Sequence, residues 1–400
     1  MEEHKKCCYE SGCFVTTTNG TVIAGSNSNK GLLYSKDKGK TWQESNINNG
    51  YFSCLTVTGN TVIAGSDYGQ GLYYSENNGK TWHQSNVTYG LFKCLTIINN
   101  IVVAGSWSND GLFYSEDNGK TWNHSNIIFG CFLCLTVIGN IVIAGSGYNE
   151  GLFYSKDNGK TWNRSNIDTD YFDCLTTIDN TVVAGSYCSN GLLYSKDNGK
   201  TWKQSNVRSG DFSCLITIDN TVIAGSDYGQ GLFYSEDKGK TWKQSNIYYS
   251  YFDCLTVIGS TVIAGSGSWD GLFYSEDNGK TWNQSNINDG DFKCLTVIGN
   301  TVIAGSGSDK GPYYSEDNGK TWYLSLCVNS DKVYNNKDLR IWLKPSKSEI
   351  KSSNDICENT DSQENKYISQ ESLFDKIDKL YKMCNDIDEK LDEIKKSIGI

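Results

Sequence analysis

The octapeptide SEDNGKTW at residues 115–122 decides the fold, because close copies of it recur along the chain at one fixed spacing. Each copy begins 40 residues after the one before, as from Ser75 to Ser115, and the block runs from residue 12 to residue 326. A strict period of this length is typical of repeat proteins, in which each repeat is one supersecondary unit. The copies begin at Ser35, Ser75, Ser115, Ser155, Ser195, Ser235, Ser275 and Ser315.

One repeat, residues 51–90, shows which unit is repeated. Its short apolar and β-branched runs are separated by Gly-Asn and Asn-Gly turns, and no helical periodicity is present. Four short strands in each repeat predict an all-β, eight-bladed β-propeller of four-stranded antiparallel blades. A solenoid is the alternative, but it would carry atypical capping repeats, and the terminal repeats here resemble the middle ones. The expected strands are FSCLTVTG (52–59), which ends in the Gly-Asn turn, TVIAGS (61–66), GLYYS (71–75) and TWHQS (81–85).

The pattern Ser-x-Asp-x-Gly-x-Thr-Trp resembles the Asp-box, or BNR repeat, of sialidases, sortilin-type receptors and photosystem II assembly propellers. The resemblance covers residues 12–326 and implies the propeller fold, but it leaves function open because one fold hosts many functions. We expect the Asp to clamp its own turn and the Trp to pack between blades. The structural box residues are Asp37, Asn77, Asp117, Asp157, Asp197, Asp237, Asp277 and Asp317, with Trp42, Trp82, Trp122, Trp162, Trp202, Trp242, Trp282 and Trp322.

Catalysis by the box or by a sialidase site is not expected. Asn77 replaces the box Asp in the second repeat, which a turn clamp tolerates and acid–base chemistry does not. The resemblance implies three Arg residues clamping a substrate carboxylate, but Arg164, Arg208 and Arg340 are widely separated and Lys is a poor substitute. Another glycoside hydrolase would need two acids about 5–9.5 Å apart, and the sequence does not rank the candidates. These are Asp168, Asp170, Asp173, Asp211, Asp253, Asp289 and Asp291.

The loops between the second and third strands, and the links between blades, differ from repeat to repeat and should lie on one face. Variable loops on a rigid scaffold usually carry binding, and Tyr and Trp among Gly, Ser and Asn resemble a paratope. The residue before each recurring Cys also varies and starts the innermost strand, near the central channel. The expected ligand-binding residues are Tyr68, Trp107, Tyr148, Tyr187, Tyr228, Trp269, Tyr89, Phe129, Tyr248, Tyr249, Lys93, Asp173, Asp253 and Lys293.

No metal or cofactor is expected. The three His residues (His4, His83 and His124) do not fall at metal-ligand spacing. The recurring Cys, one in each repeat, is interpreted as a small buried apolar side chain, because thiols spread around a ring lie too far apart to share a metal. Fifteen Cys without paired spacing indicate reduced thiols in a reducing compartment.

Charge and hydropathy exclude further classes. The formal net charge of −10 argues against nucleic acid and anionic membranes as partners. The N-terminus has no apolar signal region, and no stretch approaches 18 apolar residues. The sequence therefore predicts a cytoplasmic protein without a membrane segment.

The tail follows a different pattern. Residues 1–11 form an N-terminal segment, and residues 327–367 are expected to hold a closing strand, LRIWL at 339–343, and a polar linker. From residue 368 to residue 400, apolar residues alternate at spacings of four and three, which predicts an α-helical coiled coil and a homo-oligomer, a single docked amphipathic helix being the alternative. The seam is Leu373, Ile377, Leu380, Cys384, Ile387, Leu391, Ile394 and Ile398.

Together these patterns predict a non-enzymatic interaction propeller. Its variable face would bind a protein or a glycan, and the coiled coil would multiply that face for avidity. Exposed Trp107 and Trp269 would favour a glycan. A carbohydrate-active hydrolase on the same fold is the alternative, and a structural or assembly component, such as a virion protein, is a further one.

Overall fold

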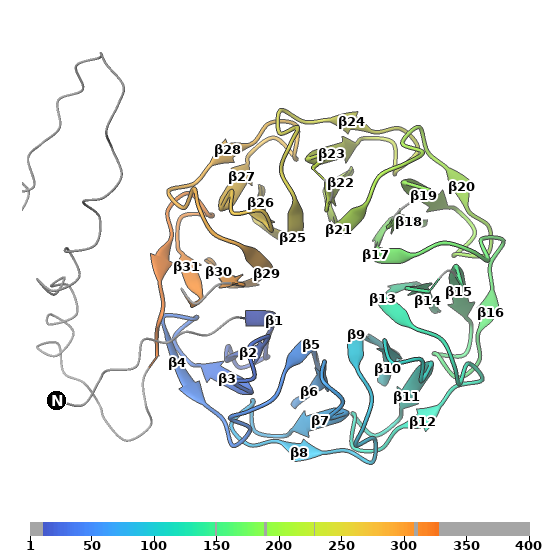
Figure 1. The fold of residues 1–400 in the computed structure, drawn as a ribbon, viewed down its shortest axis with the longest axis vertical. Coiled ribbons are helices and arrows are strands. Elements are labelled where there is room, and N and C mark those ends of the chain that lie inside the picture. The colour runs from blue at the N-terminus through green and yellow to red at the C-terminus, as the bar shows by residue number, and fades with distance from the viewer. Residues whose placement is uncertain (1–10, 149, 188–189, 228, 308–310, 328–400) are drawn as a thin grey trace, which may run out of the picture. The chain divides into compact units, whose positions relative to one another are not determined.

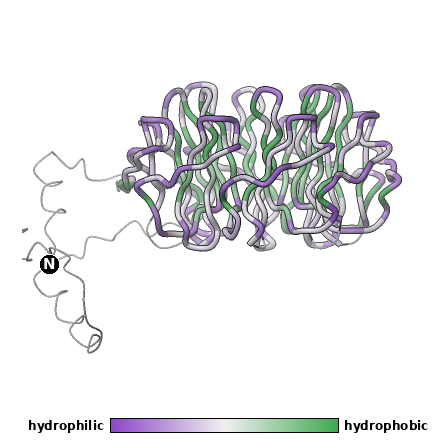
Figure 2. The backbone as a smooth tube through the Cα atoms, turned by 90° about the horizontal axis from the view of Figure 1, so that it is seen from above, coloured by the Kyte–Doolittle hydropathy of each residue, from purple (hydrophilic) through white to green (hydrophobic). Residues whose placement is uncertain are grey.

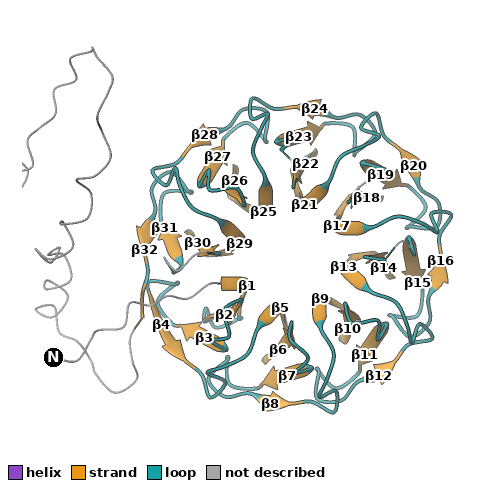
Figure 3. Ribbon diagram, viewed as in Figure 1, coloured by secondary structure: helices purple, strands orange, loops and turns teal. Residues whose placement is uncertain are grey.

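The strands form a ring of blades. The computed structural model describes residues 11–148, 150–187, 190–227, 229–307 and 311–327. Within these ranges there are eight sheets: seven have four antiparallel strands, and the eighth has four antiparallel strands and a fifth that is added in parallel. Figure 1 shows the sheets as blades around a central opening, with the first strand of each blade innermost. The predicted eight-bladed propeller is therefore confirmed, and Figure 3 shows strands and loops but no helix in the described part.

Blade 2 shows how one repeat folds. Its strands are β5 (Phe52–Thr58), β6 (Thr61–Ser66), β7 (Leu72–Ser75) and β8 (His83–Gln84), paired antiparallel in that order. The first three match the expected strands closely. The fourth is shorter than expected, because β8 pairs with β7 through two residues only and Trp82 lies before the paired segment.

The other blades repeat this order. Blade 1 contains β1 (Ser11–Thr16), β2 (Val22–Ser26), β3 (Leu32–Ser35) and β4 (Thr41–Glu44). Blade 3 contains β9 (Phe92–Ile98), β10 (Ile101–Ser106), β11 (Leu112–Ser115) and β12 (Asn123–His124). Blade 4 contains β13 (Phe132–Ile138), β14 (Ile141–Ser146), β15 (Leu152–Ser155) and β16 (Asn163–Arg164). Blade 5 contains β17 (Phe172–Ile178), β18 (Thr181–Ser186), β19 (Leu192–Ser195) and β20 (Lys203–Gln204).

The remaining blades complete the ring. Blade 6 contains β21 (Phe212–Ile218), β22 (Thr221–Ser226), β23 (Leu232–Ser235) and β24 (Lys243–Gln244). Blade 7 contains β25 (Phe252–Ile258), β26 (Thr261–Ser266), β27 (Leu272–Ser275) and β28 (Asn283–Gln284). Blade 8 contains β29 (Phe292–Ile298), β30 (Thr301–Ser306), β31 (Tyr313–Ser315) and β32 (Tyr323–Leu324), and β33 (Leu326–Cys327) follows it.

The core lies between neighbouring blades. Trp122 of blade 3 packs in one cluster with Ile63 and Leu72 of blade 2. Gly119, with φ of +84°, lets the box approach that closely, because a Cβ there would lie 2.7 Å from Ile63 Cδ1. A buried Trp ring removes about 150–250 Å² from water, worth roughly 4–6 kcal/mol of gross transfer free energy. The box Trp residues therefore hold adjacent blades together.

The box Asp clamps its own turn, as expected. Asp117 accepts hydrogen bonds from Ser115 Oγ (2.9 Å), Thr121 N (2.8 Å) and Thr121 Oγ1 (2.6 Å). Burial raises the pKa of Asp117, but these hydrogen bonds outweigh burial and leave its pKa below the usual range. In blade 2, Asn77 accepts from Thr81 N (2.9 Å) and donates its amide to Thr81 Oγ1 (2.7 Å), so the clamp survives without charge.

A second clamp, which was not predicted from the sequence, joins each of blades 1–7 to the next blade. Asn86 accepts a hydrogen bond from Trp122 N (2.8 Å) and donates to Trp122 O (3.0 Å). The signal was the Ser-Asn pair that follows the fourth strand of blades 1–7; blade 8 has Ser325-Leu326 at this place. The same pair of hydrogen bonds joins Asn46 to Trp82, Asn126 to Trp162, Asn166 to Trp202, Asn206 to Trp242, Asn246 to Trp282 and Asn286 to Trp322.

The ring closes where blade 8 meets blade 1. Strand β33 adds to β4 in parallel, with Leu326 N donating to Lys40 O (2.9 Å). Ile298 and Ile303 of blade 8 pack with Trp42 of blade 1, and Lys40 pairs with Glu316 (2.8 Å). Strand β33 at Leu326–Cys327 was not predicted, and the closing strand expected at 339–343 stays a prediction. That segment, the N-terminal residues 1–10 and the predicted coiled coil at 368–400 lie outside the described residues.

We predict that Asp117→Ala lowers the free energy of unfolding by about 1–3 kcal/mol, because Thr121 N, Thr121 Oγ1 and Ser115 Oγ lose the carboxylate that accepts their hydrogen bonds. Asp117→Asn should change it by less than about 1 kcal/mol, because Asn77 already fills this position in blade 2. Chemical denaturation of the two variants measures the difference. Equal losses would contradict a hydrogen-bonding role for the carboxylate.

Candidate functional site

The constant and variable loops lie on opposite faces of the ring. Turns between first and second strands meet the Asp-box of the next blade: Asp179 pairs with Lys238 at 2.7 Å, and Asn99 Nδ2 donates to Asn158 Oδ1 at 2.9 Å. The links between blades and the second-to-third loops meet elsewhere, as where Trp107 N donates to Leu91 O at 2.6 Å. Figure 2 shows the strands running between these two loop-bearing faces. We call the second one the variable face.

The residue before each recurring Cys is a β-bulge. In blade 3, Cys94 pairs with Gly105 and Phe92 with Ser106, so Lys93 is the extra residue of the ladder. Bulges redirect side chains, which explains why this position varies while its neighbours do not. The sequence showed the variation but not the bulge. The bulged residues of blades 2–8 are Ser53, Lys93, Leu133, Asp173, Ser213, Asp253 and Lys293.

Most of the predicted aromatic residues are exposed on the variable face. Tyr249 is 90% exposed, Tyr68 is 74% and Trp269 is 60%, values that leave whole ring faces open to a ligand. Tyr89, Phe129, Tyr148 and Tyr248 are also more than half exposed, and Tyr187 less so. Trp107 is half-buried, and Tyr228 lies outside the described residues.

Five aromatic side chains follow one another around the opening across blades 2–5. The ring centroids of Tyr51 and Tyr68 are 5.0 Å apart, those of Trp107 and Tyr148 are 5.2 Å apart, and those of Tyr148 and Tyr171 are 6.5 Å apart. We call these residues the aromatic arc. Tyr51 and Tyr171 were not among the predicted site residues, although each is the last residue of a variable link between blades, INNGY and IDTDY.

Between Tyr68 and Trp107 the arc encloses an open depression of about 480 Å³. Its floor contains an ion pair, with Lys93 Nζ 2.5 Å from Asp67 Oδ2. The pair joins the bulged residue of blade 3 to the second-to-third loop of blade 2, so the depression straddles two blades. The lining residues are Asp67, Tyr68, Gly69, Leu91, Lys93 and Trp107.

Trp107 is held in place by the next blade. A Cβ on the buried Gly147 would lie 2.2 Å from Trp107 Cζ3 and 2.8 Å from Leu133 Cδ1. The indole therefore rests on a glycine of blade 4, beside the bulged Leu133. This packing holds the indole in place, and it means that removing Trp107 disturbs the boundary between blades 3 and 4 as well as the surface.

Beyond the arc the face becomes acidic. The half-buried Asp173, Asp211 and Asp227 come from blades 5 and 6, and their carboxylates have no hydrogen bond or ion pair in the described part of the chain. Burial, followed by the charges of Asp227 and Asp211, raises the pKa of Asp173 to about 6. Burial, then Asp253, likewise raises the pKa of Asp227. We call these three residues the acidic group. Asp227 was not among the predicted site residues, because Tyr228 was selected from the same loop.

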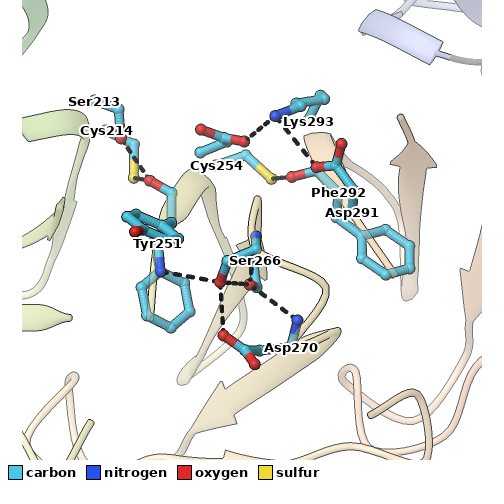
Figure 4. Close-up of polar contacts among 12 residues, drawn as sticks. Ser213, Cys214, Tyr251, Cys254, Ser266, Asp270, Asp291, Phe292 and Lys293 are labelled. Atoms are coloured by element: carbon cyan, nitrogen blue, oxygen red, sulfur yellow. Dashed lines mark hydrogen bonds and ion pairs between the residues drawn. The ribbon is translucent and has the colours of Figure 1, made fainter. Parts of the chain in front are cut away.

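On blades 7 and 8 the charges are paired. Figure 4 shows Lys293 between two carboxylates, 2.6 Å from Asp253 Oδ2 and 3.2 Å from Asp291 Oδ1. Lys93 is likewise paired with Asp67. Both bulged lysines are thus engaged by neighbouring acids, and neither ion pair involves the acidic group.

The recurring thiols are structural, as expected. Cys254 Sγ donates to Phe292 O of the next blade at 3.3 Å (Figure 4), and Cys54 does the same to Phe92 O at 3.2 Å. Burial raises the pKa of Cys54 to about 12, so the thiol stays protonated. Among the described residues no group of His, Cys, Asp or Glu is arranged to hold a metal ion.

The remaining sequence candidates are dispersed. Arg164 lies over the Phe153 ring at 5.2 Å on an outer strand, Arg208 is exposed on the link between blades 5 and 6, and Arg340 is outside the described residues. His83 and His124 lie on outer strands against Tyr74 and Phe113. Asp170 is buried and accepts from Ser186 Oγ and Asn190 Nδ2, both at 2.6 Å, as a loop clamp.

Comparison with known proteins agrees with this geometry. A comparison with curated protein sequences found no match. Among the described residues, no helix has the length and apolar content needed to cross a bilayer. The family model for the BNR/Asp-box repeat matches residues 73–84, 113–124, 153–164, 193–204, 273–284 and 313–324.

Solved structures share the fold at low sequence identity. The computationally designed Ika8 protein matches with a TM-score of 0.62 and 13% identity, covering 76% of this chain and 95% of Ika8. BamB from Moraxella catarrhalis matches with a TM-score of 0.56 and 16% identity, covering 78% and 97%. YCF48, in a structure bound to D1 peptide, matches with a TM-score of 0.50 and 16% identity, covering 65% and 91%. Likeness at this level shows the propeller fold alone.

We predict that Asp173→Asn stabilises the protein at neutral pH. The folded-state pKa of about 6 exceeds the ordinary 3.8, so the fold favours the protonated form, and wild-type stability falls as pH rises from about 4 through about 6. Asn removes that loss, a gain on the order of 1–3 kcal/mol at neutral pH that disappears near pH 4. Chemical denaturation across this pH range measures it.

Asp168→Asn is the matched control, because Asp168 is exposed on the neighbouring link and the substitution removes the same charge. It should leave stability unchanged at both ends of the range. A gain for Asp173→Asn that is independent of pH would contradict the assignment.

Proposed function

We propose that this chain, an eight-bladed propeller of BNR/Asp-box repeats, is a non-enzymatic binding module whose variable face takes a protein or glycan ligand. The aromatic arc is the observation that carries the proposal. The arc gathers five large rings on one face, with Tyr68 and Tyr148 more than half exposed, and exposed apolar surface of this kind usually marks an interaction site. Tyr and Trp supply rigid contact area at small entropic cost, as in antibody paratopes.

The scaffold supports this reading. The aromatic side chains lie on loops, while the strands, box turns and Asn–Trp clamps beneath them hold the backbone in place. A rigid frame keeps the entropic cost of binding low. YCF48, a propeller of similar fold, has been solved with a D1 peptide bound, which is an example of a peptide ligand on this architecture. Exposed Trp269 is the feature that suits a glycan.

The hydrolase alternative has one observation in its favour. Burial and the charges of Asp227 and Asp211 raise the pKa of Asp173 to about 6, and a carboxyl group with a raised pKa near a second carboxyl group is the pattern of a glycosidase. The depression described above lies over blades 2 and 3, however, and its single carboxylate, Asp67, is engaged by Lys93. Hydrolysis of chromogenic glycosides by the wild type, lost in Asp173→Asn, would establish the enzyme and overturn the binding proposal.

Cytoplasmic location, expected from the sequence, is kept as part of the proposal. It is supported by the free thiols among the described cysteines, which suit a reducing compartment.

Replacing two exposed tyrosines of the arc by serine should weaken ligand binding without unfolding the protein. Full-length wild type and Tyr68→Ser/Tyr148→Ser are compared on a glycan array and a random peptide array. Both rings are more than half exposed, so we expect at least about tenfold weaker binding with little change in melting temperature. Trp107 is not substituted, because it packs on Gly147 and its loss would lower stability as well as binding.

Tyr323→Ser is the matched control, because Tyr323 is also more than half exposed but lies on outer strand β32. It should bind like the wild type. Unchanged binding by the arc variant, or an equal loss in the control, would contradict the assignment of the arc.

Deleting residues 368–400 should convert an oligomer into a folded monomer, because the heptad seam from Leu373 to Ile398 is the expected site of association. Light scattering gives the mass, and the melting temperature reports whether the propeller remains folded. Binding to a multivalent surface should weaken by about 10²-fold or more through lost avidity. An unchanged molar mass per particle, after allowing for the deleted residues, would refute the coiled-coil proposal.

A further inference from the structure

The aromatic arc leads directly into the acidic group. Tyr171, the last ring of the arc, is two residues before Asp173 and contacts Tyr148 at 6.5 Å. The apolar and acidic parts of the variable face are therefore continuous around the opening. A ligand that lies along the arc from blade 2 to blade 5 arrives at the three carboxylates.

The acidic group has no ion pair with a cation within the described residues, and Lys293 acts on Asp227 only through its charge, which partly offsets the rise in the Asp227 pKa. Lys93 is engaged by Asp67, and Lys293 by Asp253 and Asp291, whereas Asp173, Asp211 and Asp227 have no ion pair or hydrogen bond in that part of the chain. Like charges gathered on a half-buried surface repel one another, so a ligand cation placed among them is attracted. The lysine pairs nearby show that this face compensates its other acids.

The geometry favours an organic cation over a metal ion. Among the described residues no three carboxylate, imidazole or thiol groups converge tightly enough to hold a metal. A Lys or Arg side chain does not require such convergence: its apolar stem can lie on an aromatic ring while its charged head reaches several acceptors. Tyr171 and Asp173, two residues apart at the start of β17, bring a ring and a carboxylate to one short segment of the variable face.

We propose that the ligand of the variable face is a peptide segment in which a Lys or Arg side chain neighbours aromatic or aliphatic residues, the cation lying among Asp173, Asp211 and Asp227 and the apolar residues lying along the arc. This inference rests on the proposed binding function and narrows it. A neutral glycan would leave the three carboxylates uncompensated, and an acidic glycan would be repelled by them. Charge complementarity therefore favours a basic, apolar peptide.

The test begins with a displayed library of random peptides panned against the full-length protein. Enrichment of peptides that combine Lys or Arg with aromatic or aliphatic residues is the expected result. Enriched peptides are then synthesised, each with a counterpart in which Gln replaces Lys and Arg, and their affinities are compared by fluorescence polarisation. The Gln counterparts should bind at least about tenfold more weakly, and the difference should shrink as salt is raised.

Asp173→Asn/Asp227→Asn locates the cation. It should weaken the basic peptides by about tenfold and leave the Gln counterparts unaffected. The control Asp179→Asn/Asp219→Asn removes the same charge from turns of the opposite face, where Asp179 pairs with Lys238 and Asp219 accepts from Asn278. The control should bind the basic peptides as the wild type does. Melting temperatures confirm that both variants are folded.

Each contrary result has its own meaning. Enrichment without a basic bias, equal losses in the two double variants, or binding of array glycans with no peptide enriched would overturn the basic-peptide inference while leaving the binding face in place. Failure of every peptide and glycan to bind would overturn the proposed function and the inference with it.

Discussion

The contact between each box Trp and the preceding blade is the constraint on which the rest of the structure depends. The Trp122 ring packs against Ile63 and Leu72, while Asn86 of that same preceding blade holds both backbone polar groups of Trp122. The ring supplies apolar burial, and the two hydrogen bonds fix its register. Because this joint recurs around the ring, each blade is positioned by its neighbour, and the closing joint joins Trp42 to Ile298 and Ile303.

A frame built in this way separates stability from recognition. The turns that carry the Asp-boxes face one side, so substitutions there disturb the joints. The loops on the other side differ from blade to blade. Aromatic residues from Tyr51 to Tyr171 occupy one part of this face. Carboxylates without an ion pair occupy the next part, at Asp173, Asp211 and Asp227. Eight near-identical repeats thus produce a face that lacks eightfold symmetry. A single asymmetric ligand segment needs such an asymmetric face.

Two local features convert repeat variation into this surface. The β-bulge before each recurring Cys redirects one side chain of each blade, so Lys93, Leu133 and Asp173 replace one another at equivalent places. The residue after the constant Ser then decides how much room a side chain of the adjacent loop or strand has. Gly147 leaves space for the Trp107 indole. Gly267 leaves space for the Asp253 carboxylate, because a Cβ on Gly267 would lie 2.1 Å from Asp253 Oδ2. A small residue in one loop therefore places a large or charged one beside it.

The sequence by itself determined the propeller, the number of blades, the strand order and the split into constant and variable loops, because a fixed period and turn chemistry are local properties of the chain. It also identified most exposed rings, such as Tyr68 and Trp269. The tertiary structure alone decided which of these meet. Tyr51 joins the face through its contact with Tyr68 of the same blade, whereas Tyr171 meets Tyr148 of the preceding blade and Asp227 acts on Asp173 of another blade. Trp107 is half-buried because Gly147 of the next blade leaves space, and ring closure at Leu326 depends on β4, nearly 300 residues earlier. Such contacts join residues far apart in sequence, and no local pattern records them.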